Sequence, residues 1–483
     1  MNISFNTEEI LVGGQWQKVK SGETLDLINP STGEFLCKIG RGSKQDVDAA
    51  VLAAHEALNG EWGKMTAVER GRIITNIGIE LKKYEDELTE LETNDVGKPV
   101  KQARADAIAM ARYMEFYGGA ADKIMGQTIP YMDGYTVYTM REPHGVTGHI
   151  VPWNYPMQII GRCVGGALAM GNVCVLKPAE EACLTALLFA RIAEDAGLPK
   201  GVLNVVTGLG AEAGAALSGH PDIDHISFTG SVNVGKMIQK SAGENIVPVT
   251  LELGGKSPQI VFEDADLDAA LPFLVGAGIQ NGGQTCSAGT RILVQRSIHD
   301  KLVSMMADKI NTLKVGPAMD DLDVGPLISA RQKEIVDGYV KFGVENGLSI
   351  AAEGNIIDNC PDKGCYVKPT LFTGATNDHK LSQEEIFGPV QVVIPFDTEE
   401  EAIKIANGTE YGLVTGVWTQ NGARQMRMAK AVKAGQIFVN NYGAGGGVEL
   451  PFGGMGKSGY GREKGFEALN SFSVIKTVAT FHG

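Results

Sequence analysis

The 483-residue sequence has no long apolar run and no block of basic residues. A membrane-spanning helix needs about 18 or more apolar residues in succession, so we expect none. The net charge is −14, from 43 Lys and Arg against 57 Asp and Glu. Nucleic acids and anionic membrane surfaces attract basic patches, and we therefore expect neither as a partner. The segment from Met1 to Glu9 lacks a basic stretch followed by an apolar one, so no secretory signal peptide is expected.

Cysteines are few and scattered: there are seven, an odd number. Secreted proteins usually pair their cysteines, so this usage predicts reduced thiols and a cytoplasmic location. The nearest pair, Cys360 and Cys365, has a spacing that fits neither a redox motif nor a typical zinc site, and no histidine adjoins it. We interpret both as structural and predict no metal site.

What the chain does have, from about Val146 onward, is a regular alternation of strand-like and helix-like segments. This alternation predicts an α/β fold with parallel sheets covered by helices on both faces, and with ligands at the carboxyl ends of the strands. Gly254 and Gly255 are the expected hinge between two such regions. The expected strands are 173–176, 202–206, 225–228 and 247–253 in the first region, and 260–262, 291–294 and 391–394 in the second.

The N-terminal part predicts a hairpin over residues 9–19, turning at Gly13 and Gly14. Capping pairs then predict two helices. Ser43 with Asp46 opens one over residues 47–58, and Thr66 with Glu69 opens one through about Leu91.

Two further segments have strand character but no evident sheet of their own. Residues 127–141 contain Asp133-Gly134 as a turn signal and predict an exposed hairpin. Residues 473–479 predict a strand. Such exposed strands commonly pair with another copy of the chain.

Two glycine turns predict a phosphate-binding edge. Residues 208–214 and residues 228–235 each follow a strand and open a helix. A helix N-terminus offers free N–H groups and a favourable dipole to phosphate. Either turn alone could be ordinary, but the two together favour a dinucleotide. Lys177 and Glu180, after the strand at 173–176, could bind a ribose, and the carboxylate would repel a 2′-phosphate, which favours NAD over NADP. The alternative is a solvated Lys–Glu pair at a helix start.

Cys286 lies among small residues between Gly282 and Gly289, with no partner cysteine nearby. It is either buried packing or a nucleophile. Glu252, alone in an apolar strand, is costly to bury unless it is paired or functional. Its alternative is a place on the solvent face of the strand. Asn154 lies in a loop between two prolines, where its amide could bind an oxyanion with the Cys286 N–H, or could simply form a turn.

With these segments in this order, the chain resembles the NAD(P)-dependent aldehyde dehydrogenase superfamily over essentially its full length. The matching segments are residues 152–156, 177–180, 228–231, 251–256, 283–286, 385–389 and 451–454. The resemblance implies that Cys286 attacks an aldehyde, that Asn154 holds the oxyanion, and that Glu252 activates the water that hydrolyses the thioester. It implies NAD as cofactor, with NADP less favoured, and cofactor contacts from Ile150, Trp153, Lys177, Glu180, Gly210, Gly214, Phe228, Gly230, Ser231, Leu253, Glu385 and Phe387.

The same resemblance implies an aldehyde dehydrogenase-like fold, in which a Rossmann-type domain is joined to an α/β catalytic domain and a β oligomerisation arm. The implied ranges are 1–124 and 144–254 for the NAD-binding domain, 255–467 for the catalytic domain, and 125–143 with 468–483 for the arm. A homodimer or homotetramer follows from the arm.

Substrate contacts are expected from Tyr155, Arg162, Ile279 and Phe452. Ile279 and the small loop from Gly443 to Gly447 depart from the family's pattern and suggest a reshaped pocket. Arg162, about two helical turns after Asn154, suggests a semialdehyde or an aromatic or polar-ended aldehyde. The alternative for Arg162 is a pair with a protein carboxylate.

Two other functions share this pattern. A CoA-acylating aldehyde dehydrogenase would resolve the thioester with CoA, and members of that branch generally lack the base glutamate. A non-catalytic scaffold of the same fold would not need Cys286, Glu252 and Asn154 together.

Overall fold

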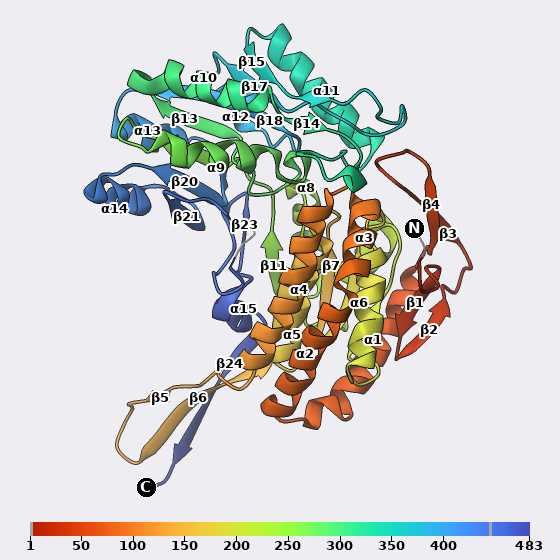
Figure 1. Ribbon diagram of the computed structural model, residues 1–483. Coiled ribbons are helices and arrows are strands. Elements are labelled where there is room, and N and C mark those ends of the chain that lie inside the picture. Colours follow the sequence, from red (N-terminus) through yellow and green to blue (C-terminus); the bar gives the residue numbers. More distant parts are fainter. Residues whose placement is uncertain (1–2, 444–446) are drawn as a thin grey trace.

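A computed structural model describes residues 3–443 and 447–483, and its core is built on two sheets (Figure 1). Five strands of the first sheet run parallel, and antiparallel strands close both of its edges. Its spatial order is β2 (Gln15–Lys18), β1 (Glu9–Val12), β9 (Leu203–Val205), β8 (Val173–Pro178), β7 (Val146–Val151), β10 (His225–Thr229), β11 (Val249–Glu252) and β23 (Gly459–Tyr460).

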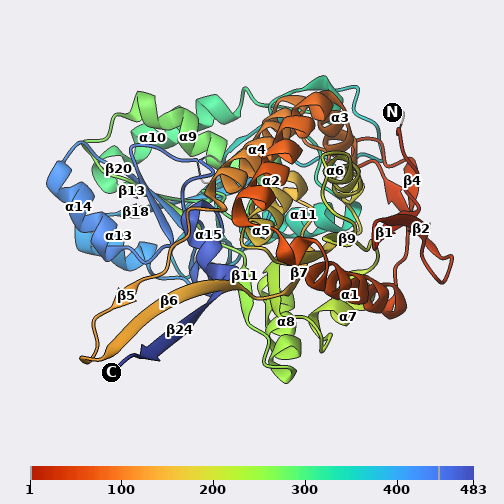
Figure 2. The same cartoon turned by 90° about the horizontal axis from the view of Figure 1, so that it is seen from below.

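Helices cover both faces of this sheet, as the alternation predicted. Figure 2 shows four helices on one side of β7, namely α2 (Ala67–Leu81), α4 (Val100–Ala120), α5 (Pro156–Ala169) and α6 (Leu184–Asp195). On the other side lie α1 (Lys44–Asn59), α7 (Ala215–Ser218) and α8 (Val232–Glu244).

The second sheet is parallel except for one antiparallel edge strand, β15. Its order is β15 (Ser349–Glu353), β17 (Thr370–Thr373), β18 (Val390–Phe396), β13 (Arg291–Gln295), β12 (Pro258–Val261), β20 (Val414–Trp418) and β21 (Gln436–Val439). The helices of this region are α9 (Leu267–Ile279), α10 (His299–Ile310), α11 (Ala330–Glu345), α12 (Lys380–Gln383), α13 (Glu399–Ala406) and α14 (Gly422–Ala431).

The chain joins the two sheets twice. Gly254 and Gly255, the expected hinge, connect β11 to β12. Neighbouring atoms leave little room for a side chain at either position. A Cβ on Gly254 would lie 2.0 Å from Glu385 Oε2, and a Cβ on Gly255 would lie 2.4 Å from the Cys286 carbonyl oxygen. Close approach to the Cys286 main chain therefore requires glycine at 255, whereas a side chain at 254 would have to displace the end of the Glu385 side chain.

The second connection is β23, which comes from the C-terminal region but pairs with β11 of the first sheet, Gly459 opposite Glu252. The adjacent Ser458 accepts from Leu253 N at 3.1 Å through its carbonyl. Its hydroxyl donates to Gly254 O at 2.7 Å and accepts from Gly412 N at 3.0 Å.

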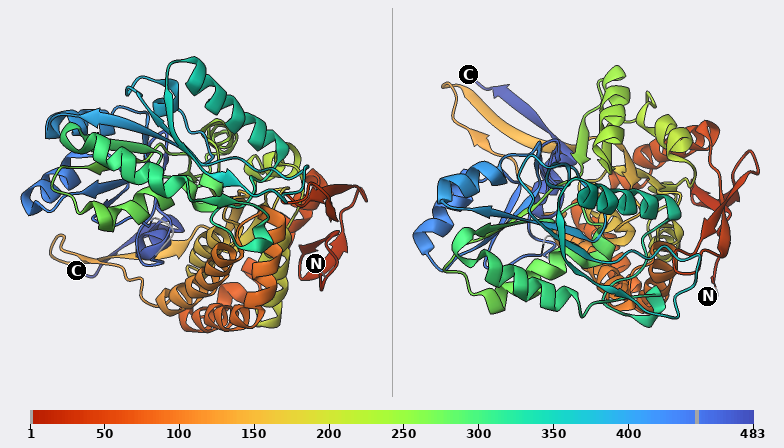
Figure 3. Two further views of the ribbon diagram at one scale, coloured as in Figure 1. Left: turned by 45° about the horizontal axis from the view of Figure 1, so that its top comes forward. Right: turned by 90° about the horizontal axis from the view of Figure 1, so that it is seen from above.

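A three-stranded sheet projects from the body, formed by β5 (Thr128–Ile129), β6 (Tyr135–Pro143) and β24 (Ser473–Phe481). Figure 3 shows from two further directions that it stands away from both main sheets. The predicted hairpin at 127–141 is confirmed. The expectation that the C-terminal strand lacks a sheet of its own is wrong, because β24 pairs along its whole length with β6, from Ser473 opposite Pro143 to Phe481 opposite Tyr135.

The helix predicted to run from Thr66 through about Leu91 is also corrected. It is broken by a short 3-10 segment at Lys82–Tyr84, and α3 (Glu85–Val96) begins anew. Three acidic residues in its first turn favour a helix N-terminus there. Both predicted capping pairs are formed: Ser43 N donates to Asp46 at 2.9 Å and Thr66 N to Glu69 at 2.8 Å.

The remaining elements are short: β3 (Thr24–Ile28), β4 (Phe35–Gly40), β14 (Lys314–Val315), β16 (Asn355–Ile356), β19 (Tyr411–Gly412), β22 (Met455–Gly456) and α15 (Gly465–Ser471). All seven cysteines are free thiols. Within the described ranges, no helix has both the length and the apolar character needed to cross a membrane.

Candidate active site

Cys286 lies where two cavities meet. It follows α9 and a turn at Asn281 to Gly283, and it is half-buried. One cavity, of about 570 Å³, lies on one side of the thiol and is called here the larger cavity. A chamber of about 40 Å³, the inner chamber, lies on the other. Asn154, Thr229 and Cys286 line both. A group bound in one space can therefore react with a group bound in the other at this sulfur.

The larger cavity opens at the carboxyl ends of the first sheet. Ser231, at the N-terminus of α8, accepts from Val234 N at 3.4 Å, and α8 directs its free N–H groups toward this cavity. The rings of Trp153 and Phe387 meet edge to face on its wall, with centroids 5.3 Å apart. Of the predicted cofactor and catalytic residues, those that line it are Trp153, Asn154, Gly230, Ser231, Glu252, Cys286, Glu385 and Phe387.

A separate cluster gathers the predicted ribose-binding pair. Lys177 Nζ lies 2.8 Å from Glu180 Oε2, and Gly210 N donates to Glu180 Oε1 at 3.3 Å. A Cβ on Gly214 would lie 4.0 Å from the Lys177 side chain. The Lys–Glu pair foreseen as an alternative is thus formed, with Lys177 buried rather than solvated. The three other predicted residues, Ile150, Phe228 and Leu253, are buried within or just after strands β7, β10 and β11.

Glu252 ends β11 with only 2 % of its surface exposed. Among the described residues, neither of its carboxylate oxygens has a hydrogen-bond partner. Burial, and then the nearby carboxyl of Glu463, raise the pKa of Glu252 well above its ordinary value, while Arg162 and Arg462 oppose the shift. An unpaired carboxyl of this kind can take a proton from water at the cavity wall.

The thiol itself is held in its protonated form. Burial raises the pKa of Cys286 to about 12, and Glu385 and Glu252 add to the rise, while Arg162 lowers it. The thiolate is the reactive species, so the site needs a base or a bound cation to form it. Burial also raises the pKa of Glu385 to about 7, against a hydrogen bond from Gly255 N at 3.0 Å.

Asn154 is held through both its side chain and its main chain. Its side-chain Nδ2 donates to Gln284 O at 2.9 Å, and its main-chain carbonyl accepts from Asn281 Nδ2 at 2.9 Å. Sequence reasoning missed Asn281 and Gln284. The signal available was an asparagine before two glycines, a combination that tolerates a left-handed turn.

The inner chamber is walled by long side chains from several elements. Tyr155 contacts Thr285 through their hydroxyl groups at 2.9 Å. Tyr113, Gln158, Phe452 and Lys464 complete the wall, and of these only Phe452 was predicted. Burial, with Arg162 nearby, lowers the pKa of Lys464 to about 7.

Arg162 lines the inner chamber, but its guanidinium is already paired. Its Nε lies 2.5 Å from Glu463 Oε2, and Nη2 donates to Thr229 Oγ1 at 3.2 Å. The guanidinium also lies over the ring of Phe452, 5.1 Å from the centroid. The pair with a protein carboxylate, left open by the sequence, is therefore present.

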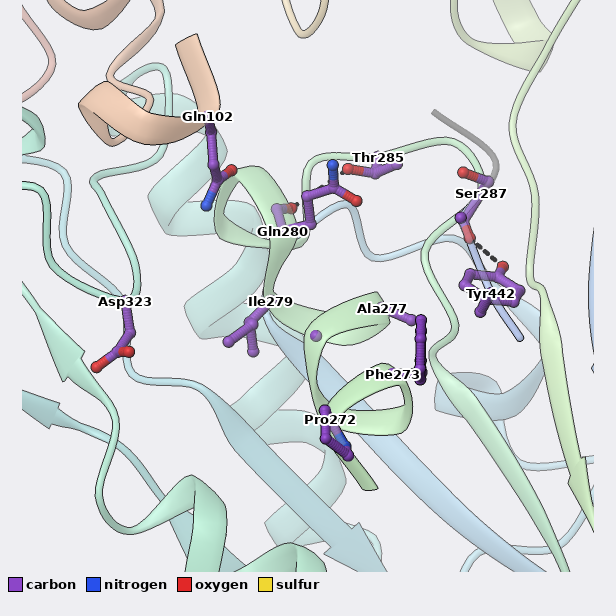
Figure 4. A pocket seen from close by; sticks show the side chains of 12 residues that line it. Gln102, Pro272, Phe273, Ala277, Ile279, Gln280, Thr285, Ser287, Asp323 and Tyr442 are labelled. Atoms are coloured by element: carbon purple, nitrogen blue, oxygen red, sulfur yellow. Dashed lines mark hydrogen bonds between the residues drawn. The ribbon is translucent and has the colours of Figure 1, made fainter. Parts of the chain in front are cut away.

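An outer chamber of about 330 Å³ continues from the inner one through Gln280, Thr285 and Ser287 (Figure 4). Ile279, predicted as a substrate contact, lies on its wall, and Tyr442 donates a hydrogen bond to the Ser287 carbonyl. A Cβ on Gly276 would meet nothing within 4 Å. Gly443 also lines this chamber, but residues 444–446 of the predicted small loop lie outside the described residues.

Known proteins are similar to this chain in sequence and in fold. Residues 16–478 match the sequence profile described as "Aldehyde dehydrogenase family". Aldehyde dehydrogenase family 2 member B4, mitochondrial, from Arabidopsis thaliana is 42 % identical over 483 residues, covering 99 % of this chain and 89 % of the relative.

Solved structures agree. A candidate aldehyde dehydrogenase from Burkholderia cenocepacia superposes with a TM-score of 0.98 at 56 % identity, covering 98 % of this chain and 100 % of that one. The NAD+ complex of the aldehyde dehydrogenase from Bacillus cereus has a TM-score of 0.96 at 41 % identity, covering 99 % and 97 %.

Proposed function

Since the chain belongs to the aldehyde dehydrogenase family and oxidises aldehydes to carboxylic acids, we propose that it does so with NAD and with Cys286 as nucleophile. The observation that carries this proposal is that Cys286 and Asn154 line both cavities, so that a cofactor in the larger one and an aldehyde in the inner chamber meet at one sulfur.

The larger cavity suits the pyrophosphate and nicotinamide parts of a dinucleotide, and the separate cluster at Lys177 and Glu180 suits the adenosine end. The wall of the cavity includes a helix N-terminus and two aromatic rings, and the related Bacillus cereus enzyme was solved with NAD+. Gly230 and Ser231 would hold the pyrophosphate, Glu385 the nicotinamide ribose, and Lys177 with Glu180 the adenosine ribose. When bound, the nicotinamide accepts the hydride.

The residues of the chain would carry the remaining steps. The Cys286 thiolate adds to the aldehyde carbon and forms a thiohemiacetal, while the Asn154 amide and the Cys286 N–H hold the oxygen. Loss of hydride leaves a thioester on Cys286. Glu252 takes a proton from water, which then attacks the thioester and releases the acid. The low water access around Glu252 keeps its carboxyl basic enough for this task.

The substrate is proposed to be a semialdehyde or an aromatic or polar-ended aldehyde. Two basic side chains, Arg162 and Lys464, and three rings, Tyr113, Tyr155 and Phe452, line the inner chamber. Arg162 is already paired with Glu463, and burial lowers the pKa of Lys464 to about 7, so these two favour a polar end through hydrogen bonds, while the rings favour a flat one.

An aldehyde panel tests these proposals. We expect NADH from purified protein, NAD and aldehydes that include succinic semialdehyde, benzaldehyde and neutral aliphatic aldehydes of matched length. Cys286→Ala should abolish it and Cys360→Ser should not, because Cys360 lies in neither cavity. Activity that survives in Cys286→Ala would refute the mechanism. Thioester transfer to added CoA would instead support a CoA-acylating enzyme, and a Cys286 that neither substrate nor NAD protects from labelling would support a scaffold.

Assembly, domain limits and location remain proposals. We propose a homodimer or homotetramer formed through the projecting sheet, which exposes Tyr131, Ile475 and Phe481 by 60 % or more. We propose the domain ranges given by the resemblance, with β23 as a strand that lies in the range of the catalytic domain but pairs with the first sheet. The free thiols favour a cytoplasm-like location.

A further inference from the structure

We propose that Asn281, which lies behind the reaction cavity, is a positioning residue that orients the amide of Asn154 beside Cys286. The inference deepens the proposed function, because it rests on the oxyanion role proposed there for Asn154.

Three buried amides form a closed ring of hydrogen bonds. Asn281 Nδ2 donates to Asn154 O, Asn154 Nδ2 donates to Gln284 O, and Gln284 Nε2 donates to Asn281 O, each at 2.9 Å. Their exposed fractions are 1 %, 4 % and 0 %. Each side chain thus holds the main chain of another member of the ring, and each residue takes part in two of the three bonds.

The ring fixes which end of the Asn154 amide faces the thiol. A carbonyl oxygen accepts hydrogen bonds only, so the group facing Gln284 O must be the NH₂ of Asn154 rather than its oxygen. One N–H of that NH₂ is used by Gln284. The second N–H remains for the cavities that Asn154 and Cys286 both line. This is the donor that an oxyanion on the substrate requires.

The backbone explains why residue 281 is asparagine. Asn281, Gly282 and Gly283 are three successive left-handed residues, with φ of 50°, 63° and 74°. Among residues that carry a side chain, asparagine tolerates this conformation best. It therefore supplies an amide donor at a position where most other side chains would strain the turn.

Two further bonds anchor the ring to the rest of the protein. Asn281 N donates to Gln102 Oε1, on α4, at 2.8 Å. Ile328 N, shortly before α11, donates to Gln284 Oε1 at 2.9 Å. The ring is thus tied to a helix of the first sheet and to a loop of the second region, and it transmits their rigidity to Asn154.

Asn281 does not line either cavity that meets at Cys286. An effect of Asn281 on the reaction is therefore indirect. It passes through Asn154 or through the loop that carries Cys286, and only the first route is lost when the Asn154 amide is removed. A displacement of about 1 Å at a reacting group can cost on the order of 10²-fold in rate. We expect a smaller loss here, because the bond from Asn154 Nδ2 to Gln284 survives when Asn281 is changed.

A double-mutant cycle between Asn281→Gly and Asn154→Ala tests the inference. Glycine accepts the left-handed backbone and removes only the amide, and alanine at 154 keeps the carbonyl that Asn281 holds. The readout is the single-turnover rate of NADH formation at saturating NAD. We expect about a tenfold loss for Asn281→Gly in the wild-type background and none in the Asn154→Ala background, because the amide it orients is then absent. The KM for NAD should stay unchanged.

Asn440→Gly is the matched control. Asn440 is also left-handed, with φ of 51°, and its amide also bonds main-chain atoms, those of Thr419. It lines none of the cavities described above. It should keep the wild-type rate, which would show that replacing a left-handed asparagine is harmless in itself.

The outcomes separate this inference from the proposed function. Equal losses from Asn281→Gly in both backgrounds, with a slow Asn154→Ala, would overturn the inference alone. A wild-type rate in Asn281→Gly would overturn it as well. A wild-type rate in Asn154→Ala would overturn the oxyanion role and the inference with it. If Asn281→Gly does not fold, Asn281→Asp keeps the shape and the turn preference but removes the donor, and the same cycle applies.

Discussion

The larger cavity and the inner chamber share Cys286 but are walled in different ways. The larger cavity is lined by loops that follow strands, such as those at Trp153 and Gly230, and by residues at the start of α11. The inner chamber is built from long side chains on α4, α5 and the C-terminal region, which hold one another in place. The larger cavity can therefore keep the steps that are common to many substrates, while single side-chain changes in the inner chamber alter which substrate binds. The predictions below test that division.

The largest effect is expected at Glu252, on the wall of the larger cavity. Glu252→Gln removes the base for thioester hydrolysis, and general base catalysis contributes about 10²–10⁴-fold. We expect steady-state turnover to fall within that range while about one NADH per active site still forms in a rapid first phase. Stopped-flow absorbance and mass spectrometry of the acylated protein would measure both. Full turnover in the variant would show that another group activates the water.

The next effect is on stability, in the wall of the inner chamber. Arg162→Met leaves the carboxylate of Glu463, which is fully buried, without its cation. Removing one partner of a buried pair costs about 3–5 kcal/mol. We expect that loss in the free energy of unfolding, measured with urea, and its partial recovery in the double variant with Glu463→Gln.

An exposed pair gives the control for Arg162→Met. Arg296 and Asp397 form two hydrogen bonds, but their side chains are 57 % and 55 % exposed. Arg296→Met should leave the free energy of unfolding almost unchanged, because solvent screens an exposed ion pair. If the two arginine variants cost the same, the wall of the inner chamber is not held by its buried pair.

The thiol between the two spaces should show a steep pH dependence. Burial raises the pKa of Cys286 to about 12. Below that pH, each unit by which the pH is raised increases the thiolate fraction about tenfold. Labelling of Cys286 by iodoacetamide, with Cys286→Ala as the blank, should therefore accelerate about 100-fold from pH 7 to pH 9. Arg162→Met should slow labelling, because Arg162 lowers this pKa. A rate that levels off below pH 9 would contradict the burial of the thiol.

The smallest effect is expected far from the sulfur, at Glu180. Burial raises the pKa of this carboxyl, but Lys177 and the hydrogen bonds to the carboxylate lower the pKa by more. The net shift is downward, so Glu180 is ionised at neutral pH. Glu180→Ser removes the charge that would repel a 2′-phosphate and frees Lys177 to bind one. We expect the preference for NAD over NADP, as a ratio of kcat/KM, to fall about tenfold, or roughly 1.4 kcal/mol. An unchanged ratio would place cofactor discrimination elsewhere.

The same division explains what the sequence could predict. The strands, Gly230 with Ser231, and Glu252 lie in short segments whose local pattern reports their position. Glu385 and Phe387 were predicted only through the family resemblance, and the α11 residues of the larger cavity were not predicted. Tyr113, Gln158 and Lys464 escaped notice because their place in the inner chamber depends on how α4, α5 and the C-terminal region pack, which no local pattern records. Arg162 was predicted from its helical spacing and from the family resemblance, but its partner Glu463 lies about 300 residues away in sequence.

Asn281 shows a different limit. Its residue type agrees with a left-handed turn, but its function depends on a ring closed by Asn154, from the other end of the cofactor-binding region. The break between α2 and α3 was missed because the apolar spacing continues across it, and only the acidic first turn of α3 marks the new start.

The pairing of β23 with β11 makes the position of Glu252 depend on the contact between the two halves of the protein. The bonds at Ser458 that join the two halves of the protein are made to Leu253 and Gly254, the residues next to Glu252, the proposed base. Separation of the two halves would consequently also displace Glu252. On heating or in denaturant, the enzyme should lose its activity when the halves begin to separate, before the hydrophobic core of either half unfolds.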